Sequence, residues 1–210
     1  MKKEWKDEIK ALVESAKNVY VSSVDENGYP NTKAMLSLQR DGFGIHYFST
    51  NLSSKRAAQF KANPKACIYY CDESAFHGLM LTGKIEVCTD AYHKQLLWRE
   101  GFECYYPKGV TDDDYCVYKF TAEKCRYYPG SSETFDICEL LDDTYAQITQ
   151  LVKKFAESGW DLITEPSKVW LDGKKNTNEL AIEQADKECG SCGCEFDALY
   201  KRFLDLKAFI

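Results

Sequence analysis

The sequence predicts an α+β fold, with antiparallel strands in the first part of the chain and helices in the last part. Short runs rich in β-branched and aromatic residues recur between residues 19 and 128, separated by turn residues. This pattern is typical of strands joined by tight turns. From residue 142 onward, apolar residues recur at helical spacing. We therefore expect two domains, residues 1–138 and a mainly helical extension at residues 139–210.

Turn and cap residues place the individual elements. Glu26-Asn27-Gly28 tolerate positive φ and indicate a hairpin between the first two strands. Asn63-Pro64 ends a short helix that Ser53 or Ser54 can cap. We expect strands at 19–25, 32–39, 43–49, 66–71, 78–88, 115–121 and 124–128, and helices at 4–17, 53–62, 90–99, 142–157, 177–188 and 195–209.

Composition excludes several classes of protein. The 210 residues are 44% apolar and 29% charged, which excludes intrinsic disorder, and the net charge of −6 argues against a nucleic-acid partner. No apolar stretch approaches the ~18 residues of a membrane helix. The first residues lack the apolar core of a signal peptide. Ten cysteines are then expected to be reduced thiols in a cytoplasmic protein.

Positive charge is concentrated in one window of this acidic chain. Residues 29–66 contain six cations and a single acid, Asp41, for a net charge of +5. Within this window, residues 48–59 combine a strand end, a polar turn and the adjacent cations Lys55 and Arg56 at a helix start. Backbone N–H groups, hydroxyls and cations can converge there on a phosphate. The alternative is a capped, solvated basic helix.

No familiar catalytic constellation is present in the sequence. None of the three histidines, His46, His77 and His93, has metal-ligand spacing with another histidine or a carboxylate, and His46 and His93 are expected to be structural. No nucleophile elbow or glycine-rich phosphate loop occurs. If the protein is an enzyme, we expect a cofactor to supply the chemistry.

Four motifs in order resemble a known family. Pro30–Met35, Thr50–Arg56, Asn63-Pro64 and Leu79–Lys84 are similar to the pyridoxamine 5'-phosphate oxidase-like FMN-binding split barrels, and within them to the general-stress-protein branch. The resemblance covers about residues 5–128. It implies a six-stranded antiparallel split β-barrel with flanking helices, to which the helical C-terminal extension is added. It also implies a homodimer with FMN at the interface.

The resemblance also implies a set of FMN-binding residues. Lys33 stands where the family has an arginine that reaches the FMN phosphate, and Ser54, Lys55 and Arg56 match the phosphate turn. Other matched positions lie along the ring and ribityl chain: Ala34, Met35, Leu36, Ser49 and Thr50. His77 and Gly78 fall near a position where many members offer a glutamine to the flavin, and this chain lacks that glutamine.

The chain departs from the true vitamin B6 oxidases of that family. Leu38 replaces a lysine for the substrate phosphate, and Arg126–Pro129 do not match the basic substrate motif. These departures favour an FMN-dependent reductase of a small molecule, or of the flavin itself, over a vitamin B6 oxidase. The alternative is a non-catalytic flavin-, haem- or deazaflavin-binding protein of redox or stress response.

A cysteine cluster lies outside the resemblance. Cys189, Cys192 and Cys194 have the spacing C-x-x-C-x-C between two expected helices. Soft thiolates favour zinc or an iron–sulfur centre. A closed zinc site needs four ligands, so the fourth would come from another cysteine such as Cys138 or from a second chain. A redox pair of Cys189 with Cys192, or a loop of inert thiols, are the alternatives.

Overall fold

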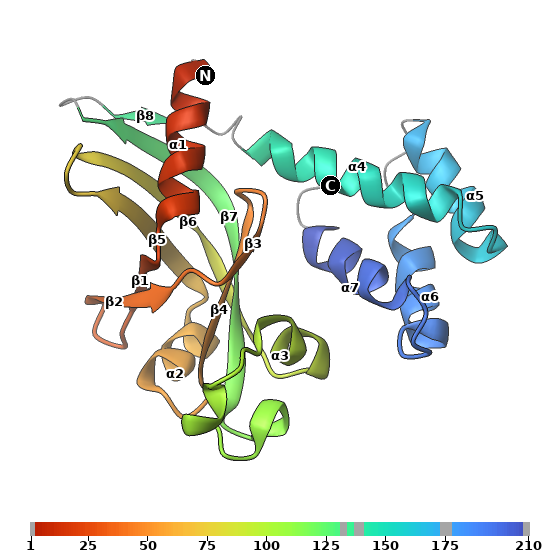
Figure 1. Cartoon of the computed structure of the whole chain (residues 1–210), viewed down its shortest axis with the longest axis horizontal. Coiled ribbons are helices and arrows are strands. Elements are labelled where there is room, and N and C mark those ends of the chain that lie inside the picture. Colours follow the sequence, from red (N-terminus) through yellow and green to blue (C-terminus); the bar gives the residue numbers. More distant parts are fainter. Residues whose placement is uncertain (1–2, 131–133, 137–140, 173–177, 208–210) are drawn as a thin grey trace. The chain divides into compact units, whose positions relative to one another are not determined.

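A computed structural model of the chain describes residues 3–130, 134–136, 141–172 and 178–207. It consists of two compact units, Met1–Leu141 and Asp142–Ile210, which we describe separately (Figure 1). The expected domain boundary at 138/139, and Cys138 itself, lie outside the described residues.

Unit 1 is built on one curled antiparallel sheet, which confirms the expected α+β split-barrel class (Figure 1). Its strands run in the order β2-β1-β5-β6-β7-β4-β3, and β8 pairs with β7. The strands are β1 (Asn18–Val24), β2 (Pro30–Leu36), β3 (Gln39–Asp41), β4 (Ile45–Asn51), β5 (Lys65–Asp72), β6 (His77–Cys88), β7 (Tyr115–Pro129) and β8 (Phe135–Asp136).

The expected number of six strands is wrong, because the sheet has eight. Two of these are the short strands β3 and β8, which have too few residues to show an alternating pattern. Conversely, the two expected closing strands at 115–121 and 124–128 are one continuous strand, β7. The break expected between these two strands coincides with a shift of register: Thr82 pairs with Lys124 and Gly83 with Ala122, which leaves Glu123 of β7 as the extra residue of a bulge.

Glycine is required at two points of this sheet. Gly28 has a φ of +84° in the β1–β2 turn, where Asp25 Oδ1 accepts from the N–H groups of Asn27 and Tyr29. At Gly83, a Cβ would lie 1.9 Å from the carbonyl oxygen of Thr121. The close approach lets β6 bend over β7 and curl the sheet.

Helices close the barrel of unit 1. Helix α1 (Lys3–Ser15) buries Ile9 and Val13 against the sheet, and Tyr127 Oη donates to Glu8 Oε2 (2.7 Å). Helix α2 (Lys55–Ala62) follows β4 and begins at its N-cap residue Ser54, as expected. Helix α3 (Ala91–Leu97) and two 3₁₀ turns, η1 (Phe102–Cys104) and η2 (Gly109–Thr111), precede β7.

Unit 2 consists, over its described residues, of four helices. They are α4 (Asp142–Ala156), α5 (Asp161–Leu171), α6 (Glu179–Cys189) and α7 (Asp197–Leu206). Their core is centred on Phe155, whose ring lies 5.6 Å from Tyr200 and 5.9 Å from Phe203. Helix α5 was not expected from the sequence, since it contains Pro166; burial of Ile163 and Trp170 compensates for the backbone hydrogen bond that proline removes.

Candidate functional site

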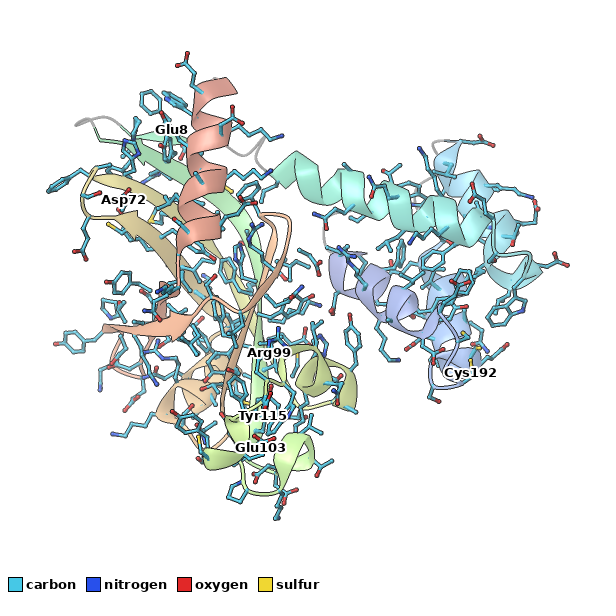
Figure 2. All side chains as sticks on the ribbon, in the orientation of Figure 1. Glu8, Asp72, Arg99, Glu103, Tyr115 and Cys192 are labelled. Carbon is cyan, nitrogen blue, oxygen red and sulfur yellow. The ribbon has the colours of Figure 1, made fainter. Side chains whose placement is uncertain are left out.

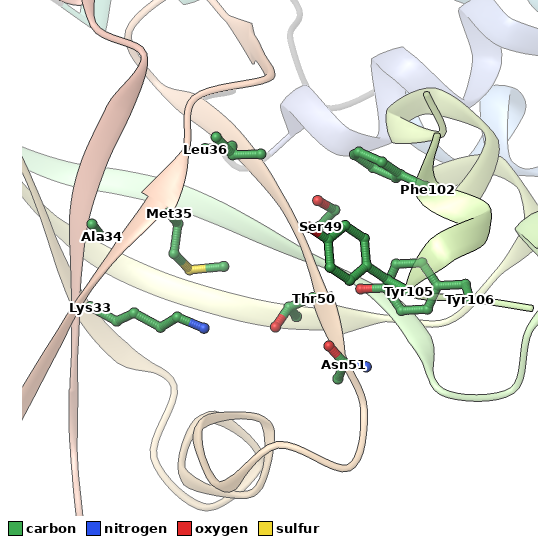
Figure 3. A pocket seen from close by; sticks show the side chains of 10 residues that line it. All are labelled: Lys33, Ala34, Met35, Leu36, Ser49, Thr50, Asn51, Phe102, Tyr105 and Tyr106. Carbon is green, nitrogen blue, oxygen red and sulfur yellow. The ribbon is translucent and has the colours of Figure 1, made fainter. Parts of the chain in front are cut away.

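A cavity of about 270 Å³ lies between β2 and β4 in unit 1 (Figure 3). The structure brings six of the expected site residues to its wall, and four further residues complete the lining. The expected six are Lys33, Ala34, Met35, Leu36, Ser49 and Thr50; the others are Asn51, Phe102, Tyr105 and Tyr106.

Strand β2 forms one wall of the cavity and is an edge of the sheet. Its register with β1, Val21 opposite Lys33 and Val19 opposite Met35, leaves its outer backbone N–H and C=O groups without a strand partner. Met35 is buried, whereas Lys33 and Leu36 are exposed. A planar ligand along this edge can therefore bond to the backbone and meet a cation at the same time.

The opposite wall is the end of β4 and the turn that follows it. One side chain, Asp114, holds this turn: its carboxylate accepts from Asn51 Nδ2 (2.8 Å), Ser53 N (2.6 Å) and Ser53 Oγ (3.0 Å). These hydrogen bonds, that of Asn51 first, lower the pKa of Asp114. The anchored turn sets the positions of Ser49 and Thr50, just before it, at the cavity.

Three aromatic side chains from the loop after α3 form the third wall, and sequence reasoning missed them. Trp98 supports this wall, with ring centroids 5.8 Å from Phe102, 6.2 Å from Tyr106 and 5.3 Å from Tyr115 (Figure 2 labels Tyr115). Tyr106 also packs on Tyr115 at 4.6 Å. The signal in the sequence was the density of aromatic residues in a segment expected to be only a loop.

Arg56 lies at the base of the β1–β2 hairpin. Its Nη1 donates to Val21 O (2.9 Å), Asn31 O (3.0 Å) and Ser23 Oγ (3.1 Å). The guanidinium thus ties the edge strand β2 to its neighbour two residues before Lys33. Burial lowers the pKa of Arg56, and the three acceptors of Nη1 are neutral oxygens.

Ser54 and Lys55 have different surroundings. Ser54 Oγ accepts from Ala57 N (3.1 Å) as the cap of α2 and lies 3.2 Å from Tyr118 Oη. Lys55 lines a second cavity, of about 420 Å³, together with Asp25 and Glu26. The structure therefore does not place Lys55 at the wall that Lys33 lines.

His77 and Gly78 lie at the start of β6, outside the lining of the β2–β4 cavity. They pair with Pro129 and Tyr128 of β7. A Cβ at Gly78 would lie 2.0 Å from Tyr69 Oη, so that a side chain there would have to displace the tyrosine.

His46 is buried within the barrel. Its Nε2 lies 3.1 Å from Phe43 O and its Nδ1 2.9 Å from Tyr70 Oη, which fits a neutral ring donating through Nε2 and accepting at Nδ1. Burial, opposed by the Phe43 bond, lowers the pKa of His46 to about 4. His93 sits on α3, where Asp90 Oδ2 lies 2.6 Å from its Nδ1. Neither histidine lines the β2–β4 cavity.

Comparisons with known proteins agree with this architecture. The family model for pyridoxamine 5'-phosphate oxidase matches residues 5–129. A crystal structure from Clostridium acetobutylicum, of a protein related to general stress protein 26 in the pyridoxinephosphate oxidase family, is 43% identical with a TM-score of 0.60, over 67% of this chain and 99% of that one.

Two more distant relatives extend the comparison. A pyridoxine/pyridoxamine 5'-phosphate oxidase of Pelagibacter ubique is 21% identical over 88% of this chain and 83% of its own length. A heme binding protein from Mycobacterium smegmatis, 13% identical over 65% of this chain and 59% of that one with a TM-score of 0.53, shares the fold.

The fold and the matched motifs define an antiparallel split-barrel protein. The chain belongs to the pyridoxamine 5'-phosphate oxidase family. Over its described residues, it contains no helix with the length and apolarity needed to span a membrane.

Proposed function

We propose that the β2–β4 cavity binds FMN at the interface of a homodimer, and that the protein is an oxidoreductase that reduces a small molecule. FMN, once bound, supplies hydride and electron transfer. The contribution of the chain is to hold the phosphate, to align the ring and to restrict water.

The observation that carries the proposal is a cation that lines the β2–β4 cavity without an acidic partner, Lys33. Among the described residues, no carboxylate forms a salt bridge with Lys33, Lys55 or Arg56. Half-buried Arg56 bonds only neutral oxygens, and exposed Lys33 lines the cavity. An anion such as a phosphate would compensate this charge, because charge-assisted bonds to phosphate are among the strongest hydrogen bonds.

The cavity walls suit the rest of the flavin. The outer edge of β2 along Ala34, Met35 and Leu36 offers backbone donors and acceptors to a ring edge, and Ser49 and Thr50 face it with hydroxyls. Burial raises the pKa of Tyr106 to about 12, so its hydroxyl stays protonated and can donate. Haem is less well supported, since the described lining contains no histidine or cysteine, and its side chains of a type that can bind haem iron are Met35, Tyr105 and Tyr106.

The open side of the cavity supports a dimer. Its volume of about 270 Å³ is below the ~300–1,000 Å³ of typical ligand sites. Leu36 is 51% exposed and Tyr105 72% exposed beside it. A second copy would complete the wall, and His77 and Gly78, which lie outside the cavity, would then serve the cavity of the partner.

A reducing compartment, the cytoplasm, fits the thiols of the chain. The nine described cysteines are free. Four of them, Cys71, Cys104, Cys192 and Cys194, are exposed, where oxidation would be expected in a secreted protein.

Phosphate recognition is tested by comparing FMN with riboflavin. Lys33→Gln should weaken FMN binding at least tenfold, because it removes a charge-assisted contact, and should leave riboflavin binding unchanged. Lys61→Gln is the matched control: Lys61 belongs to the same basic window and is exposed, but lines neither cavity. Equal losses of FMN and riboflavin affinity in Lys33→Gln would contradict a contact between Lys33 and the phosphate of FMN.

Two further measurements test the dimer and the activity. Sedimentation of the FMN-loaded protein should give the mass of two chains; a single-chain mass with FMN bound would contradict the shared site.

Turnover with NADH or NADPH and a panel of acceptors should reduce at least one small molecule. A flavin that stays oxidised under every donor would indicate a binding protein instead.

A further inference from the structure

The three clustered cysteines meet an aspartate at the turn between α6 and α7 (Figure 2 labels Cys192). Cys189 is the last residue of α6, and Asp197 is the first residue of α7. One possible ligand atom from each of Cys189, Cys192, Cys194 and Asp197 lies within 4.8 Å of the other three. Four groups therefore converge where the sequence offered three.

Two glycines allow this turn to form. At Gly190, a Cβ would lie 2.3 Å from the carbonyl oxygen of Asp186, so a larger residue would push the turn away from α6. Gly193 has a φ of +84°, which other residues rarely adopt. Its N–H donates to Asp197 Oδ2 (2.7 Å), and this bond leaves Oδ1 directed at the sulfurs.

The separations of the four groups match those around one tetrahedral ion. With metal–sulfur bonds of ~2.3 Å and metal–oxygen bonds of ~2.0 Å, tetrahedral edges are about 3.8 Å between sulfurs and about 3.5 Å between sulfur and oxygen. Cys189 Sγ and Cys194 Sγ are 3.8 Å apart, and Asp197 Oδ1 lies 3.4 Å from Cys192 Sγ and 3.2 Å from Cys194 Sγ. Cys189 Sγ and Cys192 Sγ, at 2.8 Å, would have to move apart by about 1 Å, and the two remaining pairs lie within 4.8 Å.

We propose that Cys189, Cys192, Cys194 and Asp197 bind a single zinc ion. Three thiolates favour zinc over hard cations such as magnesium or calcium. An iron–sulfur cluster does not fit, because its ligands are divided between two or more iron atoms, and ligands of different iron atoms are held farther apart than ligands of one ion. Asp197 supplies the fourth ligand, and the N–H of Gly193 orients it as the outer hydrogen bonds of zinc sites orient their ligands.

The position of the ion indicates its role. It would join the end of α6 to the start of α7. These helices also bury Ile182, Ala185 and Phe203 and are linked by ion pairs of Lys201 with Asp186 (2.6 Å) and of Lys207 with Glu183 (2.8 Å). Units of fewer than ~70–80 residues often need a metal ion or another cross-link, because a single small hydrophobic core supplies little stability. Zinc binding would then stabilise unit 2 and leave unit 1 unchanged.

The test uses the full-length, reduced protein and Zn²⁺ itself. We expect one equivalent of zinc per chain by mass spectrometry, and with Co²⁺ the visible and near-ultraviolet bands of a tetrahedral thiolate site. Cys192→Ser should weaken zinc binding at least a hundredfold, and Asp197→Asn, which keeps the shape of the side chain, at least tenfold. Cys71→Ser removes an exposed thiol of unit 1 and should change nothing.

The location of the effect provides a second readout. Removing zinc with a chelator should speed amide hydrogen exchange in α6 and α7 without changing exchange in β5 and β6. Absence of zinc binding by the reduced chain would overturn the proposal. If oxidation of that protein then forms a reversible Cys189–Cys192 disulfide, the cluster belongs to redox chemistry. Unchanged zinc affinity in both Cys192→Ser and Asp197→Asn would overturn this ligand set. Exchange in α4 and α5 reports whether each variant is folded.

Discussion

The two compact units of the chain are stabilised by different kinds of contact. In unit 1, strands distant in sequence are paired along their length, as β4 is with β7, and helices cover the resulting barrel. In unit 2, four helices of 10 to 15 residues surround a core centred on Phe155. A hydrogen-bonded ladder can support an open-sided cavity at its edge strand. The small helical unit has no such ladder between distant segments. Its cysteine cluster lies at the turn between two of its helices.

The largest expected effect comes from Phe155→Ala, which should destabilise unit 2 and leave unit 1 folded. Loss of a fully buried phenylalanine costs about 3–5 kcal/mol, comparable with the whole stability of so small a unit. Amide hydrogen exchange should become fast throughout α4–α7 and stay slow in β5–β7, and FMN affinity should not change. The control is Leu180→Ala, which removes an apolar side chain that is 77% exposed. Equal destabilisation of both units would show that they fold as one.

The comparison also explains how much could be predicted from the sequence. The hairpin at Gly28 and a cap of α2 at Ser53 or Ser54 follow from local patterns, because adjacent residues dictate them. The six cavity residues were expected from the resemblance of two motifs to the split-barrel family. Phe102 and Tyr106 were missed, since packing on Trp98 places them, and Tyr105, also missed, packs on Tyr106. Asp197 was missed for a similar reason: its role depends on where α7 begins relative to α6. Contacts that join separate elements leave no local signal.

A second prediction separates the units by pH, because all three histidines belong to unit 1. His46 takes up a proton near pH 6.5 when unfolded but only near pH 4 when folded. The unfolded state therefore binds more protons between these values, and the stability of unit 1 should fall by up to about 3 kcal/mol as the pH drops from 7 to 4. Unit 2 has no histidine to produce this loss. Amide hydrogen exchange measured from pH 7 to pH 4 gives, for each unit separately, the slope of its stability against pH.

Two variants sharpen this pH dependence. His46→Gln should flatten the dependence of the stability of unit 1 on pH between pH 7 and 5, where carboxylates contribute little. Tyr70→Phe tests the hydrogen bond of the neutral ring: it removes the hydroxyl that lies 2.9 Å from His46 Nδ1 and should destabilise unit 1 at pH 7 by about 1–3 kcal/mol. An unaltered slope in His46→Gln would mean that another group of the barrel is responsible.

The smallest expected effect concerns the polar wall of the cavity. Asp114→Asn keeps the side-chain shape but removes the charge that accepts from Ser53 N and Asn51 Nδ2, and it turns an amide donor toward one of these donors. We expect a loss of about 1–2 kcal/mol in unit 1 and faster exchange of the Ser53 amide. Asp113→Asn is the matched control: its carboxylate pairs with Lys108 at 2.6 Å, but the side chain is 86% exposed, and such surface pairs contribute little. If both variants change the Ser53 amide equally, Asp114 does not fix the β4–α2 turn, and the cavity wall must be held by the aromatic residues alone.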